Sequence, residues 1–282
     1  MTTADVRYDA GPHAGLGHHR RAEALACALR QAGVQVTVEP VGAPADGDVV
    51  VVDSYAVRAD ELGSAGAVVA IEDLGRDQRV DLLVDPNPGS EPGDYRAAKR
   101  TLLGPRYALI DPTIDGMVAS PIGERAAVAL VAVGGADPDG LGATIARTLA
   151  QLLPDAEVRL AVGPWSDEGD VDGIVAVRTS AGLADHLAAS DVVITAGGVT
   201  LLESLALGRP TVVMVVADNQ RRAADWAVDA GAAVGSTPEE AAATAAELAS
   251  DPARRRQLGD RARSVVDARG AARVAEEILT LA

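Results

Sequence analysis

Cysteine, lysine and aromatic residues are nearly absent from this sequence of 282 residues. It has one cysteine, no phenylalanine and 2% aromatic residues in all, and Lys99 is its only lysine. The single cysteine, Cys27, excludes a disulfide within the chain, and its place on the apolar face of an expected helix indicates packing. No GK[ST] motif occurs, which excludes a Walker-type phosphate loop. Alanine, valine and leucine must therefore fill the cores.

Basic residues are outnumbered by acidic ones, 25 to 41, and long apolar runs are scarce. The formal net charge of −16 argues against nucleic acid or anionic lipid as a main partner, because both bind clustered positive charge. The longest apolar runs, such as residues 126–133, fall far below the ~20 residues that a membrane-spanning helix needs. The N-terminus lacks the basic and then apolar pattern of a signal peptide. We therefore expect a cytoplasmic protein without stable membrane insertion, whose oligomeric state stays open.

Strand-like and helix-like segments alternate along the chain, which predicts parallel sheets. In the first half, strands are expected at 6–10, 34–39, 48–53, 67–73 and 81–86, with a helix over 19–33. In the second half, strands are expected at 127–133, 157–162, 173–177, 191–195 and 211–216, with helices at 141–153, 183–189, 200–207 and near the C-terminus.

A segment without periodic pattern, around residues 110–123, separates the two halves. It contains prolines and glycines but no run that favours a helix or a strand. We therefore expect an α/β protein of two Rossmann-like, doubly wound domains that face each other across a cleft, with boundaries at 1–118 and 119–282. In such sheets, ligands bind beyond the carboxyl ends of the strands.

Glycine pairs follow two of the expected strands in the second half. Gly134 and Gly135, and Gly197 and Gly198, each lie between a strand and a helix. Glycines let the backbone approach a phosphate, and a helix N-terminus favours its charge, so the pairs indicate a pocket for a nucleotide diphosphate. Turns with no ligand are the alternative for each loop taken alone.

The stretch GLGHHRR, residues 15–21, follows the first expected strand. Gly15 and Gly17 shape a turn that sets His18 at a helix start, where the helix dipole disfavours protonation and suits a neutral base. Arg20 stands where a dinucleotide fingerprint needs its third glycine, so a nicotinamide site is not expected. Adjacent His18 and His19 point in different directions from a helix, so no metal site is expected, and the role of His13 is open.

Two acidic features have competing interpretations. Glu203 lies one turn into the helix that follows the second glycine pair, where it could accept hydrogen bonds from ribose hydroxyls or simply complement the helix dipole. The D-P-D stretch at 137–139 looks like a metal signature, but its central proline and the glycine after it suit a turn better. No Ser-His-Asp arrangement or paired-carboxylate spacing is visible.

Several motifs together carry a family resemblance. They are RYDAGPHAGLGHHRRAEALACAL, VVVDSY, AIEDLGRDQRVDLLVDPNP, LLGPRYALI, VGGADPDG and ITAGGVTLLESLALGRPTVVMVVADNQ. In this order and spacing, residues 5–235 resemble the PseG family, the UDP-sugar hydrolases of pseudaminic acid biosynthesis, which is related to spore-coat polysaccharide proteins of the SpsG type. The AGG…E…G.P block alone is shared with many GT-B glycosyltransferases, including the MurG-like ones.

The resemblance implies a GT-B fold, with UDP bound mainly by the C-terminal domain and a last helix that crosses back to the first domain. It also implies that water attacks the anomeric carbon with inversion and releases free sugar and UDP, without a metal or other cofactor. His18 matches the proposed base. The residues expected to bind nucleotide or substrate are Gly15, Gly17, Arg21, Tyr55, Gly134, Gly135, Gly197, Gly198, Thr200, Glu203, Asn219 and Gln220.

Three functions therefore compete. The leading hypothesis is a hydrolase that cleaves a UDP-linked diacetamido or amino deoxy sugar. The alternative is an inverting GT-B glycosyltransferase, in which an acceptor hydroxyl replaces water in the same pocket. A protein that binds nucleotide sugars without turnover is the third. The sequence does not name the sugar.

Overall fold

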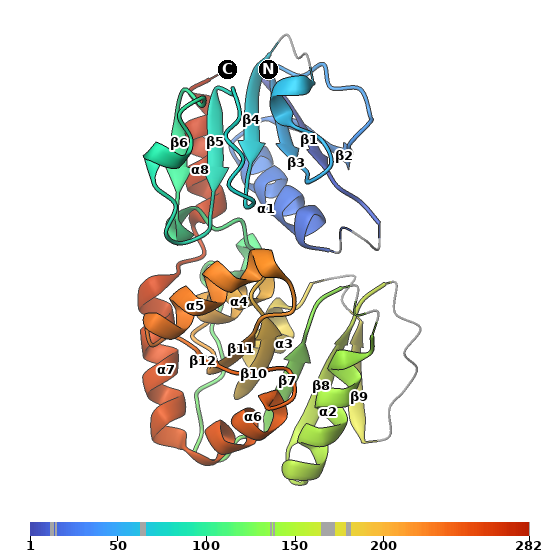
Figure 1. Ribbon diagram of the computed structural model, residues 1–282, viewed down its shortest axis with the longest axis vertical. Helices are drawn as coiled ribbons and strands as arrows, with labels where there is room; N and C mark the ends of the chain where they lie inside the picture. The colour runs from blue at the N-terminus through green and yellow to red at the C-terminus, as the bar shows by residue number, and fades with distance from the viewer. Residues whose placement is uncertain are drawn as a thin grey trace. The chain divides into compact units, whose positions relative to one another are not determined.

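The computed structural model describes residues 1–11, 14, 16–62, 66–135, 137, 139–164, 173–178 and 182–281. The chain forms two compact units (Figure 1). The first unit combines Met1–Pro112 with Ala268–Ala282, and the second is Thr113–Asp267. The sequence predicts domains at 1–118 and 119–282, whereas in the structure the first unit ends at Pro112 and also includes Ala268–Ala282.

The first unit is built on a six-stranded parallel sheet in the order β2-β1-β3-β4-β5-β6. Its strands are β1 (Thr3–Tyr8), β2 (Gln35–Pro40), β3 (Val49–Asp53), β4 (Ala67–Ile71), β5 (Leu82–Asp85) and β6 (Thr101–Leu103). The valine run of β3 is buried throughout because parallel strands in the middle of a sheet are covered on both faces.

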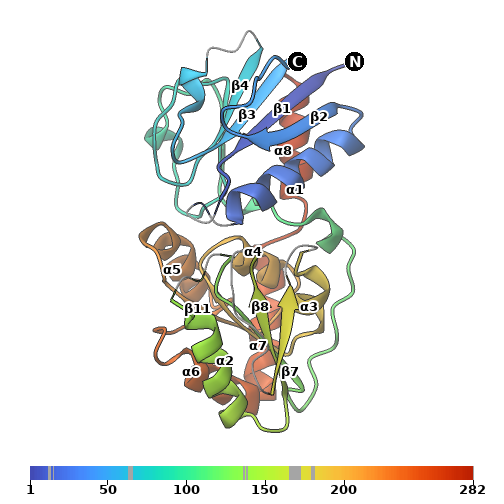
Figure 2. The same ribbon diagram turned by 90° about the vertical axis from the view of Figure 1, so that its right-hand side faces the viewer.

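Two helices cover one face of this sheet and pack against each other. They are α1 (Gly17–Gln31) and the C-terminal helix α8 (Gly270–Leu279), which lie side by side in Figures 1 and 2. Leu25 and Leu29 of α1 share a core with Val274 and Ile278 of α8. The last helix is therefore an integral part of the first unit. The other face packs against the short 3-10 helix η1 (Ala59–Glu61) and Tyr95.

Close backbone packing at the start of α8 gives a prediction about stability. A Cβ added to Gly270 would lie 2.2 Å from the carbonyl oxygen and 2.5 Å from the nitrogen of Ala108. We expect Gly270→Ala to lower the free energy of unfolding of the first unit by about 2 kcal/mol or more, because α8 must move away from the backbone. Urea denaturation followed by circular dichroism measures the change.

A matched control is Gly93→Ala, because a Cβ at Gly93 meets no atom within 4 Å and its backbone needs no positive φ. Unfolding of Gly93→Ala should match the wild type. Equal stability of Gly270→Ala and Gly93→Ala would contradict the close docking of α8.

The second unit has a six-stranded parallel sheet in the order β12-β11-β10-β7-β8-β9. Its strands are β7 (Val128–Ala132), β8 (Glu157–Val162), β9 (Ile174–Arg178), β10 (Val192–Ala196), β11 (Thr211–Met214) and β12 (Val234–Gly235). Its helices are α2 (Leu141–Leu152), α3 (Ala184–Ala189), α4 (Val199–Ala206), α5 (Arg221–Asp229), α6 (Ala241–Ser250) and α7 (Pro252–Val265). One apolar core joins the sheet to α2 and α6, which contact each other, while α3 and α4 also pack together.

The strand order reverses once in each sheet. In the first unit the chain runs outward from β1 to β2 and then returns to the other side of β1 with β3. In the second unit it runs from β7 through β8 to β9 and returns beside β7 with β10. The carboxyl ends of strands at such switch points leave a crevice for ligands. Among the helices of the described residues, none has the length and apolar character needed to cross a bilayer.

Candidate functional site

His18, Arg21 and Asp53 meet at the switch point of the first sheet. Asp53 is the last residue of β3, and both His18 and Arg21 lie in the first turns of α1, which follows β1. His18 Nδ1 lies 2.6 Å from Asp53 Oδ1. Arg21 Nε donates to Oδ2 and Nη2 donates to Oδ1 of the same carboxylate, each at 2.7 Å. His18 and Asp53 are only 2% and 1% exposed, so water competes little for these bonds.

The hydrogen-bond pattern assigns the proton on the His18 ring. Asp53 Oδ1 can only accept, so His18 Nδ1 must donate to it. Arg21 Nη2 lies 3.0 Å from His18 Nδ1, but the guanidinium also has only donors, and both groups point at the same carboxylate oxygen. In neutral His18 the lone pair is therefore on Nε2, which is the ring atom able to take a proton.

Asp53 stays ionised although it is buried. Burial by itself raises the pKa of this carboxyl, but the charge of Arg21 and the hydrogen bonds from His18 and Arg21 outweigh it and lower the pKa below its usual value. An ionised Asp53 orients the imidazole and stabilises its protonated form. The pair has the geometry of a general base with its orienting carboxylate.

Tyr55 and Asp73 complete this cluster. Arg21 Nη1 donates to Asp73 Oδ2 at 2.7 Å, and the Tyr55 hydroxyl donates to the same oxygen at 2.9 Å. The Tyr55 ring meets the His18 ring edge to face, with centroids 4.3 Å apart. Burial and the nearby charge of Asp73 raise the pKa of Tyr55 above its usual value, so the phenol remains a donor. Tyr55 is 38% exposed and can contact a ligand.

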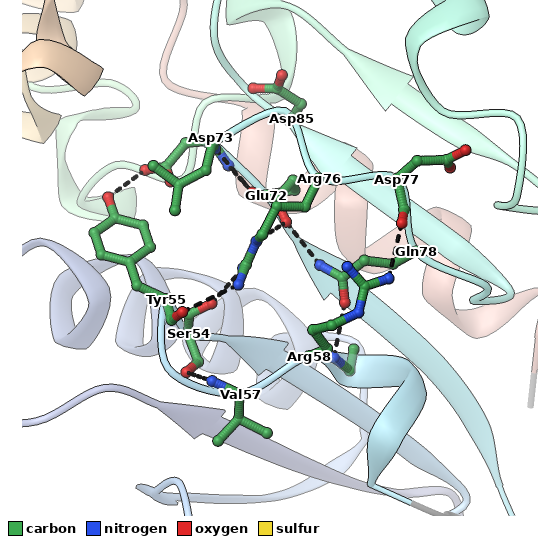
Figure 3. A network of polar contacts seen from close by, with 12 residues as sticks. Ser54, Tyr55, Val57, Arg58, Glu72, Asp73, Arg76, Asp77, Gln78 and Asp85 are labelled. Carbon is green, nitrogen blue, oxygen red and sulfur yellow. Dashed lines mark hydrogen bonds and ion pairs between the residues drawn. The ribbon is translucent and has the colours of Figure 1, made fainter.

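A second polar network fixes the loop that carries Tyr55 (Figure 3). Buried Glu72, directly after β4, accepts from Arg76 Nε at 2.9 Å and from Gln78 Nε2 at 2.7 Å, and from the next two backbone N–H groups. Arg76 in turn donates to the carbonyl oxygens of Ser54 and Tyr55. The loop after β3 is thus tied to the loop after β4.

Buried carboxylates stand at the ends of four neighbouring strands, β1, β3, β4 and β5: Asp9, Asp53, Glu72 and Asp85. Asp9 accepts from Ser54 Oγ and from the backbone N–H of Tyr55, both at 2.6 Å. Asp85 accepts from the hydroxyl of Tyr95 at 2.6 Å and from a serine and a backbone N–H of its own loop. Asp9, Glu72 and Asp85 therefore organise loops, whereas Asp53 binds the side chains of His18 and Arg21 on α1.

The glycine pairs predicted from the sequence lie at the carboxyl edge of the second sheet. Gly197, after β10, is buried against the short helix η6 (Asp218–Gln220). The packing is so close that a Cβ added to Gly197 would lie 2.5 Å from the Gln220 carbonyl oxygen. Gly134 and Gly135 follow β7, and Gly135 packs on the loop after β8, where a Cβ on Gly163 would lie 2.0 Å from the Gly135 oxygen. The structure therefore brings these loops together along one edge.

The two helices that follow the glycine pairs differ at their N-termini. Asp137 accepts from the backbone N–H groups of Leu141 and Gly142 at 3.0 and 2.6 Å, so a carboxylate of the chain already occupies the start of α2. Within the D-P-D stretch, Asp137 therefore caps a helix. At α4, the N-cap residue Gly198 is exposed and has no side chain with which to cap the helix, and Thr200 lies partly exposed in the first turn. The start of α4 therefore presents exposed backbone to which an anion can bind.

The remaining predicted residues have varied environments. Glu203 is buried within α4 at 1% exposure, and Asn219 is exposed. The Gln220 side-chain oxygen accepts a backbone N–H just beyond β11 at 3.1 Å. Gly15 and His13 lie outside the described residues. Within the described ranges, no group of three or more His, Cys, Asp or Glu side chains is placed to hold a metal ion.

No protein-family model matches this chain, and no curated protein sequence matches it. Solved structures do. The glycosyltransferase SsfS6 of Streptomyces sp. SF2575, complexed with thymidine diphosphate, is 18% identical, with 98% of this chain and 100% of that chain covered and a TM-score of 0.64.

Two further structures share the fold. MurG of Acinetobacter baumannii is 14% identical, with 99% of both chains covered and a TM-score of 0.61. MnaA of S. aureus, in a co-structure with UDP, is 12% identical, with 100% of this chain and 98% of that chain covered and a TM-score of 0.63. The chain therefore has the GT-B fold, as the sequence predicts. Likeness at these identities concerns the fold alone, and the PseG-like assignment stays a prediction.

Proposed function

We propose that the chain is an inverting glycosyltransferase that uses a nucleotide sugar as donor and His18 as general base. The observation that carries the proposal is the 2.6 Å contact between His18 Nδ1 and Asp53 Oδ1 at the β1/β3 switch point, which leaves Nε2 as the proton acceptor. Support for a nucleotide-sugar donor comes from the fold, because SsfS6, which shares it, is described as a glycosyltransferase complexed with thymidine diphosphate, and MnaA, which also shares it, is in a co-structure with UDP.

The chemistry is a single displacement at the anomeric carbon. Nε2 of His18 takes the proton of the acceptor hydroxyl while that oxygen forms a bond to the anomeric carbon. The bond between this carbon and the diphosphate oxygen breaks, and its electron pair leaves with the nucleoside diphosphate. Attack from the face opposite to the leaving group inverts the anomeric configuration. Asp53 stabilises the imidazolium that forms.

The nucleotide belongs on the second unit in this proposal. The N-terminus of α4 offers N–H groups and a favourable dipole to the diphosphate. Gly198 presents backbone without a side chain there, and Thr200 adds a hydroxyl in the first turn. Glu203, Asn219 and Gln220 remain the candidates for contacts to the nucleoside.

Hydrolysis is the second candidate function, with water in place of the acceptor hydroxyl. It is favoured by the G-x-G-H turn at 15–18 together with the DSY and ADNQ motifs, which resemble the PseG family of UDP-sugar hydrolases. The same base and the same leaving group serve both reactions. The two therefore differ only in which hydroxyl reaches His18.

A donor screen separates these functions. The protein is incubated with UDP- and TDP-linked sugars, with and without a panel of acceptor alcohols, while free nucleoside diphosphate and the product anomer are followed by NMR. Release that depends on an acceptor supports transfer, and rapid release of free sugar without one supports hydrolysis. Binding of UDP or TDP with no turnover of any donor would contradict both and favour a binding protein.

Substitutions at the second glycine pair test the nucleotide site. A Cβ at Gly198 meets no atom within 4 Å, so Gly198→Ala should keep its stability but lower affinity for UDP or TDP by about tenfold, because the methyl group occupies the approach to α4. A Cβ at Gly197 would collide with Gln220, so Gly197→Ala should lower the melting temperature instead. Calorimetric titration and thermal unfolding measure both. Unchanged affinity in Gly198→Ala would place the diphosphate elsewhere.

A further inference from the structure

His18 and four other side chains of the first unit form a closed ring of contacts. His18 binds Asp53 at 2.6 Å, and Arg21 bridges Asp53 and Asp73 with bonds of 2.7 Å. The Tyr55 hydroxyl binds Asp73 at 2.9 Å, and its ring returns to the His18 ring with centroids 4.3 Å apart. Every member of the ring is therefore linked to the base, either directly or through one neighbour.

Charges in this ring are poorly screened by solvent. The side chains of His18 and Asp53 are 2% and 1% exposed, and those of Arg21 and Asp73 are each 10% exposed. Two carboxylates and one guanidinium give the ring one net negative charge while His18 is neutral. When His18 takes up a proton, the ring becomes neutral, with charges of alternating sign along it. The arrangement thus complements the protonated imidazole that forms during the proposed reaction.

The charges of Arg21 and Asp73 have opposite effects on the protonation of His18. Arg21 Nη2 lies 3.0 Å from Nδ1, where its positive charge opposes protonation directly and also neutralises Asp53. Asp73 holds the guanidinium of Arg21 and offsets part of its charge. We propose that Arg21 and Asp73 are positioning residues that set the base strength of His18 in opposite directions, Arg21 lowering it and Asp73 raising it. The importance of this effect for catalysis rests on the proposed role of His18 as the general base.

The charged and titratable groups that face His18 come from several elements. Those in contact with it are Arg21 on α1, Asp53 at the end of β3 and Tyr55 just after that strand. Asp73, in the loop after β4, binds Arg21 and Tyr55, and Asp9, after β1, binds the Tyr55 backbone. Tyr55 remains neutral because burial and the charge of Asp73 raise its pKa. Asp9 is common to all variants considered below, so differences between them report the charges of Arg21 and Asp73.

The test is an NMR titration of the imidazole of His18 in the full chain, with no substrate present. Its resonances are assigned by their loss in His18→Gln. In Arg21→Gln, we expect the titration midpoint to rise by about one pH unit or more, because Asp53 then acts on His18 without opposition. In Asp73→Asn, the midpoint should fall by a smaller amount, since Asn still accepts from Arg21 and Tyr55 but has no charge.

Arg21→Lys is the conservative control, because it keeps the charge and loses the paired hydrogen bonds. Its midpoint should stay closer to the wild type than that of Arg21→Gln. If Arg21→Gln does not fold, Asp73→Asn alone decides. A midpoint in Asp73→Asn that is unchanged or raised would overturn the proposal, as would shifts of the same sign in Asp73→Asn and Arg21→Gln.

A kinetic comparison separates this proposal from the proposed function. The acidic limb of the pH profile of kcat/KM should follow the NMR midpoint from variant to variant. If the midpoints move in opposite directions but the pH profiles do not follow them, the electrostatic proposal stands and His18 is not the base. If neither the NMR midpoints nor the pH profiles change, the charges of Arg21 and Asp73 do not affect the protonation of His18.

Discussion

Replacing Asp53 with asparagine should slow cleavage of the nucleotide sugar by about 10³-fold while nucleotide binding persists. Three donors point at the two oxygens of Asp53, namely His18 Nδ1 and two nitrogens of Arg21. An amide supplies one oxygen and one NH2 group, so in either orientation the NH2 group faces a donor. Facing His18, it favours the tautomer with the proton on Nε2, and the base is lost. Steady-state rates and UDP or TDP affinity measure the separation.

Asp85→Asn is the matched control for this substitution. Asp85 is also a fully buried carboxylate at the end of a strand of the same sheet, and it also accepts from hydroxyl and backbone donors. It has no contact with His18 among those described. We expect Asp85→Asn to lose stability and keep its turnover, whereas a rate for folded Asp53→Asn within tenfold of the wild type would contradict the role of Asp53.

The alternation of strands and helices predicts most of this fold from sequence, because each apolar run has the length and pattern of a buried strand. The expected strand at 157–162 and the helix at 141–153 agree with β8 and α2 to within one residue. Among the described residues, the sequence pattern does not predict the strands β6 (Thr101–Leu103) and β12 (Val234–Gly235). Runs of two or three residues carry no period, and they become strands only because a neighbouring edge offers them hydrogen bonds.

The site is less predictable than the fold. His18 is recognisable from its place after a glycine turn, but its partner Asp53 lies 35 residues away and is not among the site residues that the sequence predicts. A usable signal was present, since Asp53 ends an apolar run at the carboxyl edge of a sheet. The contact itself depends on β1 and β3 being neighbours, which places Tyr8 opposite Asp53, and no local pattern encodes that order.

Arg21 illustrates a different limit. The family resemblance implies that it binds nucleotide or substrate, and the structure shows its guanidinium donating to Asp53 and Asp73. The two carboxylates beside this arginine come from separate segments, Asp53 from the end of β3 and Asp73 from the loop after β4. Only the tertiary arrangement tells whether an arginine near a turn meets a ligand or the charges of its own chain.

Replacing His18 with alanine should lower turnover by roughly two to four orders of magnitude, as is typical when a general base is lost. Nucleotide affinity should stay within a few-fold of the wild type, because the diphosphate is proposed to bind at α4 in the second unit. His19→Ala is the matched control, since His19 is the next residue of the same helix and its side chain is 45% exposed. Its turnover should equal that of the wild type. Near-normal turnover of His18→Ala with UDP- or TDP-sugars, or an equal loss in His19→Ala, would refute the assignment of the base.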